Sequence, residues 1–224
     1  MFFWDPTFIL LVPAIILAVW AQHRVRGAFA AWSEIETSRR ITGAQAAEAI
    51  LASRVLPVKI ERISGNLTDH YDPRKKVLRL SQNVYDSTSV AAVGIAAHEC
   101  GHAIQHGKGY SPLAIRNAIV PIVSIGSNLA IPLFIIGIIF SLPVLIKVGI
   151  FMFGGAVIFH LITLPVEYDA SHRALDVLNN MQILSPDELI GAREVLNAAA
   201  MTYVAAALMA IMNLMRLILI SRRR

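Results

Sequence analysis

The chain has 224 residues, of which 56% are hydrophobic and 16% are charged, whereas about 25% of the residues in soluble domains are charged. This composition excludes an ordinary water-soluble domain and indicates several lipid-embedded segments. The net charge of +5 does not predict a nucleic-acid partner, because no basic run is interleaved with aromatic residues and the cytoplasmic flanks of membrane helices collect Lys and Arg. The single cysteine, Cys100, excludes an intrachain disulfide.

Four apolar stretches are each near the roughly 20 residues that a helix needs to cross the hydrocarbon core. In chain order they cover residues 2–21, 119–140, 142–164 and 198–220. No Lys or Arg precedes the first stretch, so we expect a retained anchor rather than a cleaved signal peptide. The second and third stretches are separated by a short turn and predict a helical hairpin. The fourth carries Asn213 and Arg216, and it either crosses the membrane or lies at its interface.

The water-facing region between the first two stretches combines helices and short strands. Thr42 precedes its first predicted helix, and Asp86 or Ser87 is expected to cap its last helix, which Gly107 is placed to end. The predicted elements are a helix over 43–55, a strand over 58–63, a turn-rich segment over 66–76, a strand over 77–80 and a buried helix that continues to residue 106.

We therefore predict an α+β fold that is mainly helical, with about four transmembrane helices and a small domain that contains a short β-sheet. The predicted organisation is an N-terminal membrane anchor (1–22), a water-facing region (23–118), a transmembrane hairpin (119–164), a second, helical water-facing region (165–197), and a C-terminal membrane helix with a basic tail (198–224).

The last helix of the water-facing region contains His98, Glu99 and His102. Histidines four residues apart lie on the same helix face, one turn apart, so both imidazoles can bind a single zinc ion. Glu99 directly follows the first histidine and can accept the proton of a zinc-bound water. This pattern in a predicted helix indicates a hydrolytic metal centre rather than a chance pair of histidines.

A catalytic zinc site usually has a third protein ligand. His106 is rejected, because on a continuous helix it lies about 6 Å beyond His102 along the axis. Glu167 is favoured, because two consecutive membrane spans leave and return to the same face and place this carboxylate beside the motif. The alternative is that Glu167 is a solvated charge in the first turns of a helix. Glu188 and Glu194 are expected to be helix-surface charges.

The segments around His70, His98 and Glu167 resemble the gluzincin class of metallopeptidases, and in particular the YugP-like neutral zinc metallopeptidases of bacteria. The layout is also similar to HtpX-type membrane proteases and prenyl-protein endopeptidases. The resemblance implies zinc ligands at His98, His102 and Glu167, and a catalytic carboxylate at Glu99. HtpX-type enzymes have an Asp four residues after the ligand Glu. This chain has Ser171 there, and Asp169 is the candidate to support the metal site instead.

Further groups are needed to stabilise the transition state and to hold the substrate. Tyr71 and His172 are candidate donors, with His70 and Tyr168 as alternatives, and the spacing selects none of them. Cys100 lies about 200° around the helix from His98, so we expect a small core residue rather than a ligand. The strand over 77–80 is expected to be an edge that pairs with an extended substrate.

Basic residues near the predicted spans favour a cytoplasmic site, and the resemblance to bacterial enzymes implies a bacterial inner or plasma membrane. Eight lie on the side of the motif (Arg24, Arg26, Arg39, Arg40, Lys108, Arg116, Arg173, Arg193) and four lie opposite (Lys147, Arg222, Arg223, Arg224). We predict a multi-pass zinc metalloendopeptidase with protein or peptide substrates, and the similarity to HtpX-type enzymes implies membrane proteins among them. The alternative is a catalytically inactive, zinc-stabilised membrane scaffold.

Overall fold

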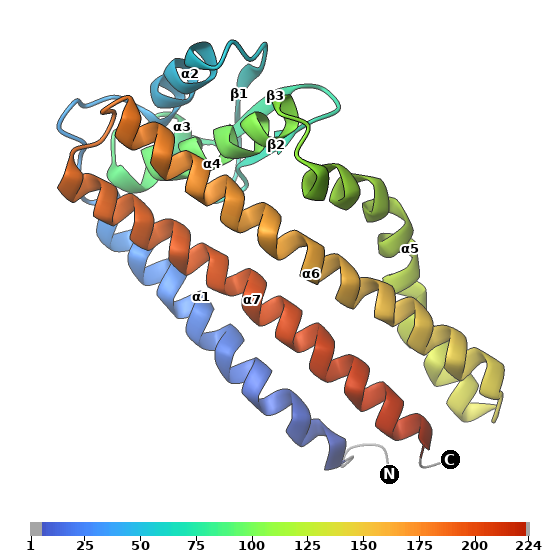
Figure 1. Cartoon of the computed structure of the whole chain (residues 1–224). Coiled ribbons are helices and arrows are strands. Elements are labelled where there is room, and N and C mark those ends of the chain that lie inside the picture. Colours follow the sequence, from blue (N-terminus) through green and yellow to red (C-terminus); the bar gives the residue numbers. More distant parts are fainter. Residues whose placement is uncertain (1–5, 223–224) are drawn as a thin grey trace. The chain divides into compact units, whose positions relative to one another are not determined.

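The computed structural model describes residues 6–222 of the chain. The start of the predicted anchor and Arg223 and Arg224 of the predicted basic tail lie outside the described residues. The chain divides into two compact units. Unit 1 contains the residues up to Ala21, Ala114–Pro165 and the residues from Met201 onward, whereas unit 2 contains Gln22–Leu113 and Val166–Ala200. Figure 1 labels the α-helices and strands of both units.

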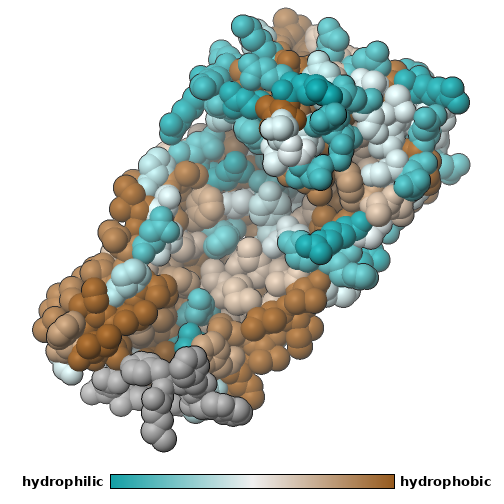
Figure 2. All heavy atoms as spheres, turned by 180° about the vertical axis from the view of Figure 1, so that it is seen from behind, coloured by the Kyte–Doolittle hydropathy of each residue, from teal (hydrophilic) through white to brown (hydrophobic). Residues whose placement is uncertain are grey.

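Unit 1 is built from apolar helices. The helices that pass through it are η1 (Pro6–Leu11), α1 (Val12–Ser33), α5 (Ser111–Ile139), α6 (Pro143–Asn180) and α7 (Pro186–Arg222). They provide four segments that are long and apolar enough to cross a membrane. Figure 2 shows brown, hydrophobic residues over the surface of these helices. Large side chains such as Phe151 (83% exposed) and Ile122 (73% exposed) face outward, as lipid-facing residues do.

The predicted hairpin is present as α5 and α6, which are joined by a short turn at Ser141. The two helices pack closely, because a Cβ on Gly149 would lie 2.7 Å from the carbonyl oxygen of Ala130. Glu167 does not lie in the first turns of a helix, as its alternative interpretation required, since α6 continues through Pro165. Membrane helices tolerate such a proline because other groups satisfy the freed backbone carbonyl.

Unit 2 contains a three-stranded sheet and several helices. Its further elements are α2 (Gly43–Ser53), β1 (Lys59–Ile63), β2 (His70–Asp72), β3 (Val77–Ser81), α3 (Gln82–Tyr85) and α4 (Val90–Gly107). The predicted helix after Thr42 is confirmed, and Thr42 forms a capping box with Gln45. The cap of α4 is Ser89 rather than Asp86 or Ser87, and its side chain accepts from the backbone N–H of Ala92.

The order of the strands corrects the prediction for the substrate edge. The order is β1-β3-β2, with β3 parallel to β1 and antiparallel to β2. The predicted strand over 77–80 is therefore the central strand, and its backbone groups are already paired on both sides. The outer strand β2 was predicted as a turn, because three residues are too few to show an alternating pattern.

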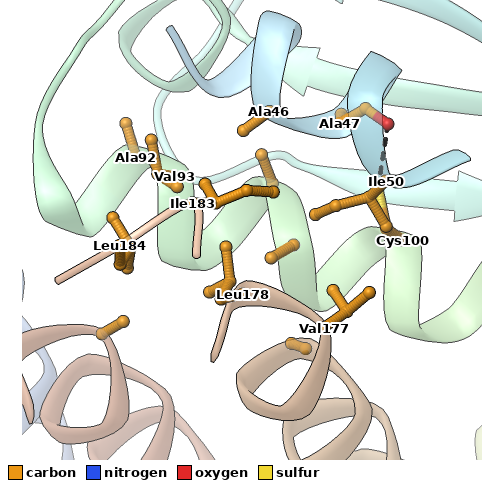
Figure 3. Packing of buried hydrophobic residues seen from close by; sticks show 14 of the residues in the cluster. Ala46, Ala47, Ile50, Ala92, Val93, Cys100, Val177, Leu178, Ile183 and Leu184 are labelled. Atoms are coloured by element: carbon orange, nitrogen blue, oxygen red, sulfur yellow. Dashed lines mark hydrogen bonds between the residues drawn. The ribbon is translucent and has the colours of Figure 1, made fainter. Parts of the chain in front are cut away.

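The core of unit 2 lies between α2, α4 and the end of α6 (Figure 3). Cys100 is fully buried in this core, and its Sγ lies 3.8 Å from the carbonyl oxygen of Ala47 in α2. This placement confirms Cys100 as a small core residue. The other labelled side chains in Figure 3 are aliphatic, so the inner face of α4 is held by apolar packing.

Candidate metal centre

The candidate metal centre is assembled from α4 and from the part of α6 that belongs to unit 2. Helix α4 is fixed on its inner face by the core, so its histidines have a defined position relative to unit 2. Its approach to α6 depends on Gly101, where a Cβ would lie 2.4 Å from the carbonyl oxygen of Ala170. Only glycine allows the two backbones to lie this close. The contact brings the turn of α4 that carries the histidines against the turn of α6 that carries Glu167.

The three predicted ligands lie together, and one ligand atom from each of His98, His102 and Glu167 lies within 4.8 Å of the others. Oε2 of Glu167 is 3.3 Å from Nε2 of His98 and 3.5 Å from Nε2 of His102. Ligand atoms at the corners of a tetrahedron with zinc bond lengths near 2.1 Å are about 3.4 Å apart. The two measured distances match that edge, so the donor set and its spacing fit a zinc ion.

The electrostatics of the centre favour a cation. Burial alone would lower the pKa of His102, but the carboxylates of Glu167 and Glu99 act in the opposite direction and hold it above its ordinary value. His102 and Glu167 are 8% and 4% exposed, so little water screens their interaction. A zinc ion would take the place of the proton that this environment attracts.

Each ligand histidine contacts a second side chain through Nδ1. Nδ1 of His98 lies 3.1 Å from Oγ of Ser171, and Nδ1 of His102 lies 3.0 Å from Oε1 of Gln105. These contacts leave both Nε2 atoms toward Glu167. Ser171, four residues after Glu167, contacts the first ligand histidine directly.

The carboxylate of Asp169 contacts Gln105 and Arg173. It accepts from Nε2 of Gln105 and from the guanidinium of Arg173. Asp169 therefore reaches His102 through the amide of Gln105. Glu99 is 8% exposed and lies on α4 directly after His98, in electrostatic contact with His102.

The two candidate donors for the transition state lie in different surroundings. Tyr71 extends from β2 to α4, where its hydroxyl group lies 2.8 Å from Nδ1 of His106, one helical turn beyond His102. The side chain of His172 is 76% exposed, and Nε2 lies 3.3 Å from Oδ2 of Asp176 on the same helix. His106 is a polar residue near the end of α4, as predicted.

The rival carboxylates lie outside the metal centre. The prediction that Glu188 is a surface charge is wrong. Its side chain is 8% exposed and accepts hydrogen bonds from Ser38 and Ser185. Glu194 accepts from the indole N–H of Trp32 and pairs with Arg24. Both carboxylates hold the start of α7 to neighbouring segments of unit 2.

Sequence reasoning did not find Gln105 and named Ser171 only as a departure from a pattern. Gln105 lies three residues after His102, so the two side chains share a helix face. That spacing was available as a signal. The partners of Gln105 on α6 are more than 60 residues away, and no local pattern indicates them.

Comparisons with known proteins indicate the family to which the chain is related. Residues 7–222 match the family described as "Putative neutral zinc metallopeptidase". The chain is 42% identical over 212 residues to "Putative membrane protease YugP" of Bacillus subtilis (strain 168), which covers 94% of each protein. No solved structure matches the chain significantly.

Proposed function

The chain belongs to the neutral zinc metallopeptidase family, and we propose that it is a membrane-embedded endopeptidase that hydrolyses peptide bonds in proteins or peptides. The family membership makes zinc its cofactor, and the four apolar helices make it a multi-pass membrane protein. The observation that carries the proposal is the convergence of His98, His102 and Glu167 at distances that suit zinc, with Glu99 beside them.

Each residue then has a chemical role. Nε2 of His98, Nε2 of His102 and a carboxylate oxygen of Glu167 would hold the metal. When bound, zinc supplies a Lewis acid that polarises a carbonyl group and makes a water molecule more acidic. Glu99 accepts the proton of the attacking water and passes it to the leaving amine. The surrounding helices limit the access of bulk water to Glu99, which keeps its interaction with the proton strong.

Tyr71 is the donor that we assign to the transition state. Burial, followed by the nearby charge of Asp72, raises the pKa of Tyr71, so its hydroxyl group stays protonated and able to donate. Its partner His106 is exposed at the end of α4, so the pair is open to a substrate. The outer strand β2, which carries Tyr71, leaves one edge for main-chain pairing with an extended substrate.

The proposed site faces the cytoplasm of a bacterial cell, and membrane proteins are among its proposed substrates. The orientation rests on the excess of Lys and Arg on the side of the motif. The curated relative of Bacillus subtilis is described as a membrane protease, which agrees with a substrate cleaved beside the bilayer.

Metal content and casein cleavage together test the proposed function. The full chain is purified in detergent as wild type, Glu99→Gln, Glu167→Gln and, as a control, Glu48→Gln on the exposed face of α2. We expect zinc in the wild type, Glu99→Gln and the control. We expect cleavage to fall about 10²–10⁴-fold in Glu99→Gln because its general base is gone. Full zinc occupancy in Glu167→Gln would contradict the assigned third ligand.

The same variants separate an enzyme from a zinc-stabilised scaffold. A scaffold retains zinc in Glu99→Gln but shows no cleavage in any form, including the wild type. An enzyme shows cleavage that depends on Glu99 while the zinc content stays constant. Casein is a suitable probe because its extended chain can pair with a strand edge without prior unfolding.

A further inference from the structure

The side chain of Gln105 joins the two helices of the metal centre. It is fully buried on α4, and its amide makes three hydrogen bonds. Oε1 lies 3.0 Å from Nδ1 of His102, while Nε2 donates to the carbonyl oxygen of Val166 at 2.8 Å and to Oδ2 of Asp169 at 2.7 Å. Val166 and Asp169 stand on either side of Glu167 in α6. One amide therefore contacts one metal ligand directly and holds the helical turn that carries another.

The orientation of this amide is fixed by its partners on α6. The carbonyl oxygen of Val166 and the carboxylate of Asp169 can only accept hydrogen bonds, so the NH₂ group must face them. The opposite orientation would place Oε1 against two acceptors and leave them unsatisfied in a buried site. Oε1 must therefore face His102.

An amide oxygen can only accept, so Nδ1 of His102 must carry the hydrogen. The lone pair of that imidazole is then on Nε2, which is the atom that lies toward Glu167. We propose that Gln105 is a positioning residue that fixes the metal-binding tautomer of His102. The same amide holds the helical turn that carries Glu167 beside this imidazole. This inference rests on the proposed zinc site, and it assigns a role to a residue outside the ligand set.

Other side-chain types cannot perform this task. A carboxylate at position 105 would accept from His102 but would not donate to Val166 and Asp169. A cationic side chain would donate to α6 but would not accept from His102. Asparagine has the same amide on a shorter stem. Glutamine therefore combines the required acceptor, the two donors and the reach.

Arg173 and Tyr110, which lie outside the metal centre, support the position of Gln105. Arg173 donates to both oxygens of Asp169, and its guanidinium lies 5.6 Å from the centre of the Tyr110 ring. The backbone N–H of Tyr110 donates to the carbonyl oxygen of Gln105 itself. The negative charge of Asp169 is thus balanced by Arg173. The neutral amide of Gln105 lies between Asp169 and His102 and contacts both.

The test compares exchanges at both ends of the hydrogen bond between Gln105 and Asp169. Gln105→Met keeps the size and removes all three hydrogen bonds, while Gln105→Glu keeps the acceptor for His102 and loses the donors to α6. The double variant combines Gln105→Glu with Asp169→Asn, so the amide and the carboxylate change places. An amide at position 169 then donates to a carboxylate at position 105, and no volume is added. Asp176→Asn is the matched control, because it removes an exposed carboxylate from the same helix.

Zn²⁺ affinity of the full chain, measured by competition with a chromophoric chelator, is the first readout. We expect Gln105→Met and Gln105→Glu to bind Zn²⁺ about 10–100-fold more weakly than wild type, as for other residues that orient metal ligands. The double variant should recover part of the loss seen in Gln105→Glu, and Asp176→Asn should bind like wild type. Equal affinity of wild type and both Gln105 variants would overturn the inference, as would a double variant that binds Zn²⁺ no more tightly than Gln105→Glu.

Visible absorption of the Co²⁺-substituted protein is the second readout, because it reports the arrangement of the ligands and not the stability of the fold. We expect the Co²⁺ bands to shift in folded Gln105→Glu and to move back in the double variant. An unchanged spectrum in folded Gln105→Glu would assign Gln105 a purely structural role and overturn the inference. A wild type that binds neither Zn²⁺ nor Co²⁺ would overturn the proposed function as well, whereas normal wild-type binding keeps the two tests separate.

Discussion

Gly101 of α4 lies against Ala170 of α6 so closely that a methyl group on Gly101 would be 2.4 Å from the carbonyl oxygen of Ala170. This approach occurs between the two ligand histidines in the sequence and three residues after Glu167 on the other helix. The contact therefore fixes how closely the helix of the histidines and the helix of Glu167 approach each other.

The first prediction concerns this helix contact. Gly101→Ala should force α4 and α6 apart, because the neighbouring atom is backbone and cannot rotate away. We expect a loss of about 1–3 kcal/mol in the free energy of unfolding, as for other overpacked positions, and weaker Zn²⁺ binding. Chelator competition and thermal unfolding measure both effects. Gly27→Ala is the control, because a Cβ there meets nothing within 4 Å, and wild-type behaviour of Gly101→Ala would contradict the contact.

The second prediction concerns the hydroxyl group of Tyr71. Tyr71→Phe removes the contact with His106 and the proposed donor, while the three zinc ligands remain. We expect unchanged zinc content and a fall in kcat of about 10²–10³-fold, the size seen when one transition-state donor is lost. Tyr85→Phe on α3 provides the matched control. Cleavage by Tyr71→Phe at the wild-type rate would remove Tyr71 from the mechanism.

The third prediction concerns pH and follows from His102. Its pKa is raised above the ordinary value of 6.5, so in the metal-free protein its interactions stabilise the fold below that ordinary value and are lost as pH rises through the raised pKa. Zinc requires the neutral imidazole, so zinc affinity should rise over the same interval. The increase in Tm on adding Zn²⁺ should therefore be larger at about pH 8 than at about pH 6.

Calorimetry or thermal unfolding with and without a chelator at the two pH values measures this difference. His102→Gln is the control, since it should remove most of the pH dependence together with the zinc response. A zinc-induced rise in Tm that is the same at both pH values would contradict the proposed competition between zinc and a proton at His102.

The fourth prediction concerns Cys100, the single cysteine of the chain. Burial, with a smaller contribution from the charge of Glu99, raises the pKa of the Cys100 thiol well above its ordinary value. The thiolate is the reactive form, so iodoacetamide should not label the native protein and should label it after unfolding. Cys100→Ala should keep zinc and activity. Rapid labelling of the native protein would show that Cys100 faces the solvent.

Much of the fold could be predicted because its signals are local. The apolar stretches indicated the four long helices, and Thr42 marked the start of α2 through its capping box. The continuity of α6 through Pro165 was not predicted, because a proline in a sequence usually marks a boundary and only packing decides whether the helix continues. The central position of β3 was also missed, since strand order depends on contacts between distant segments.

For the metal centre, the sequence by itself determined that His98 and His102 share one face of a helix with Glu99 beside them, because that geometry follows from the period of the α-helix. Only the tertiary structure decided how Glu167 meets them, because its distance depends on the close approach at Gly101. The same holds for Gln105, whose partners lie on another helix. The spacing along one helix determines which side chains share a face. The packing of two helices determines which side chains from the second helix reach that face.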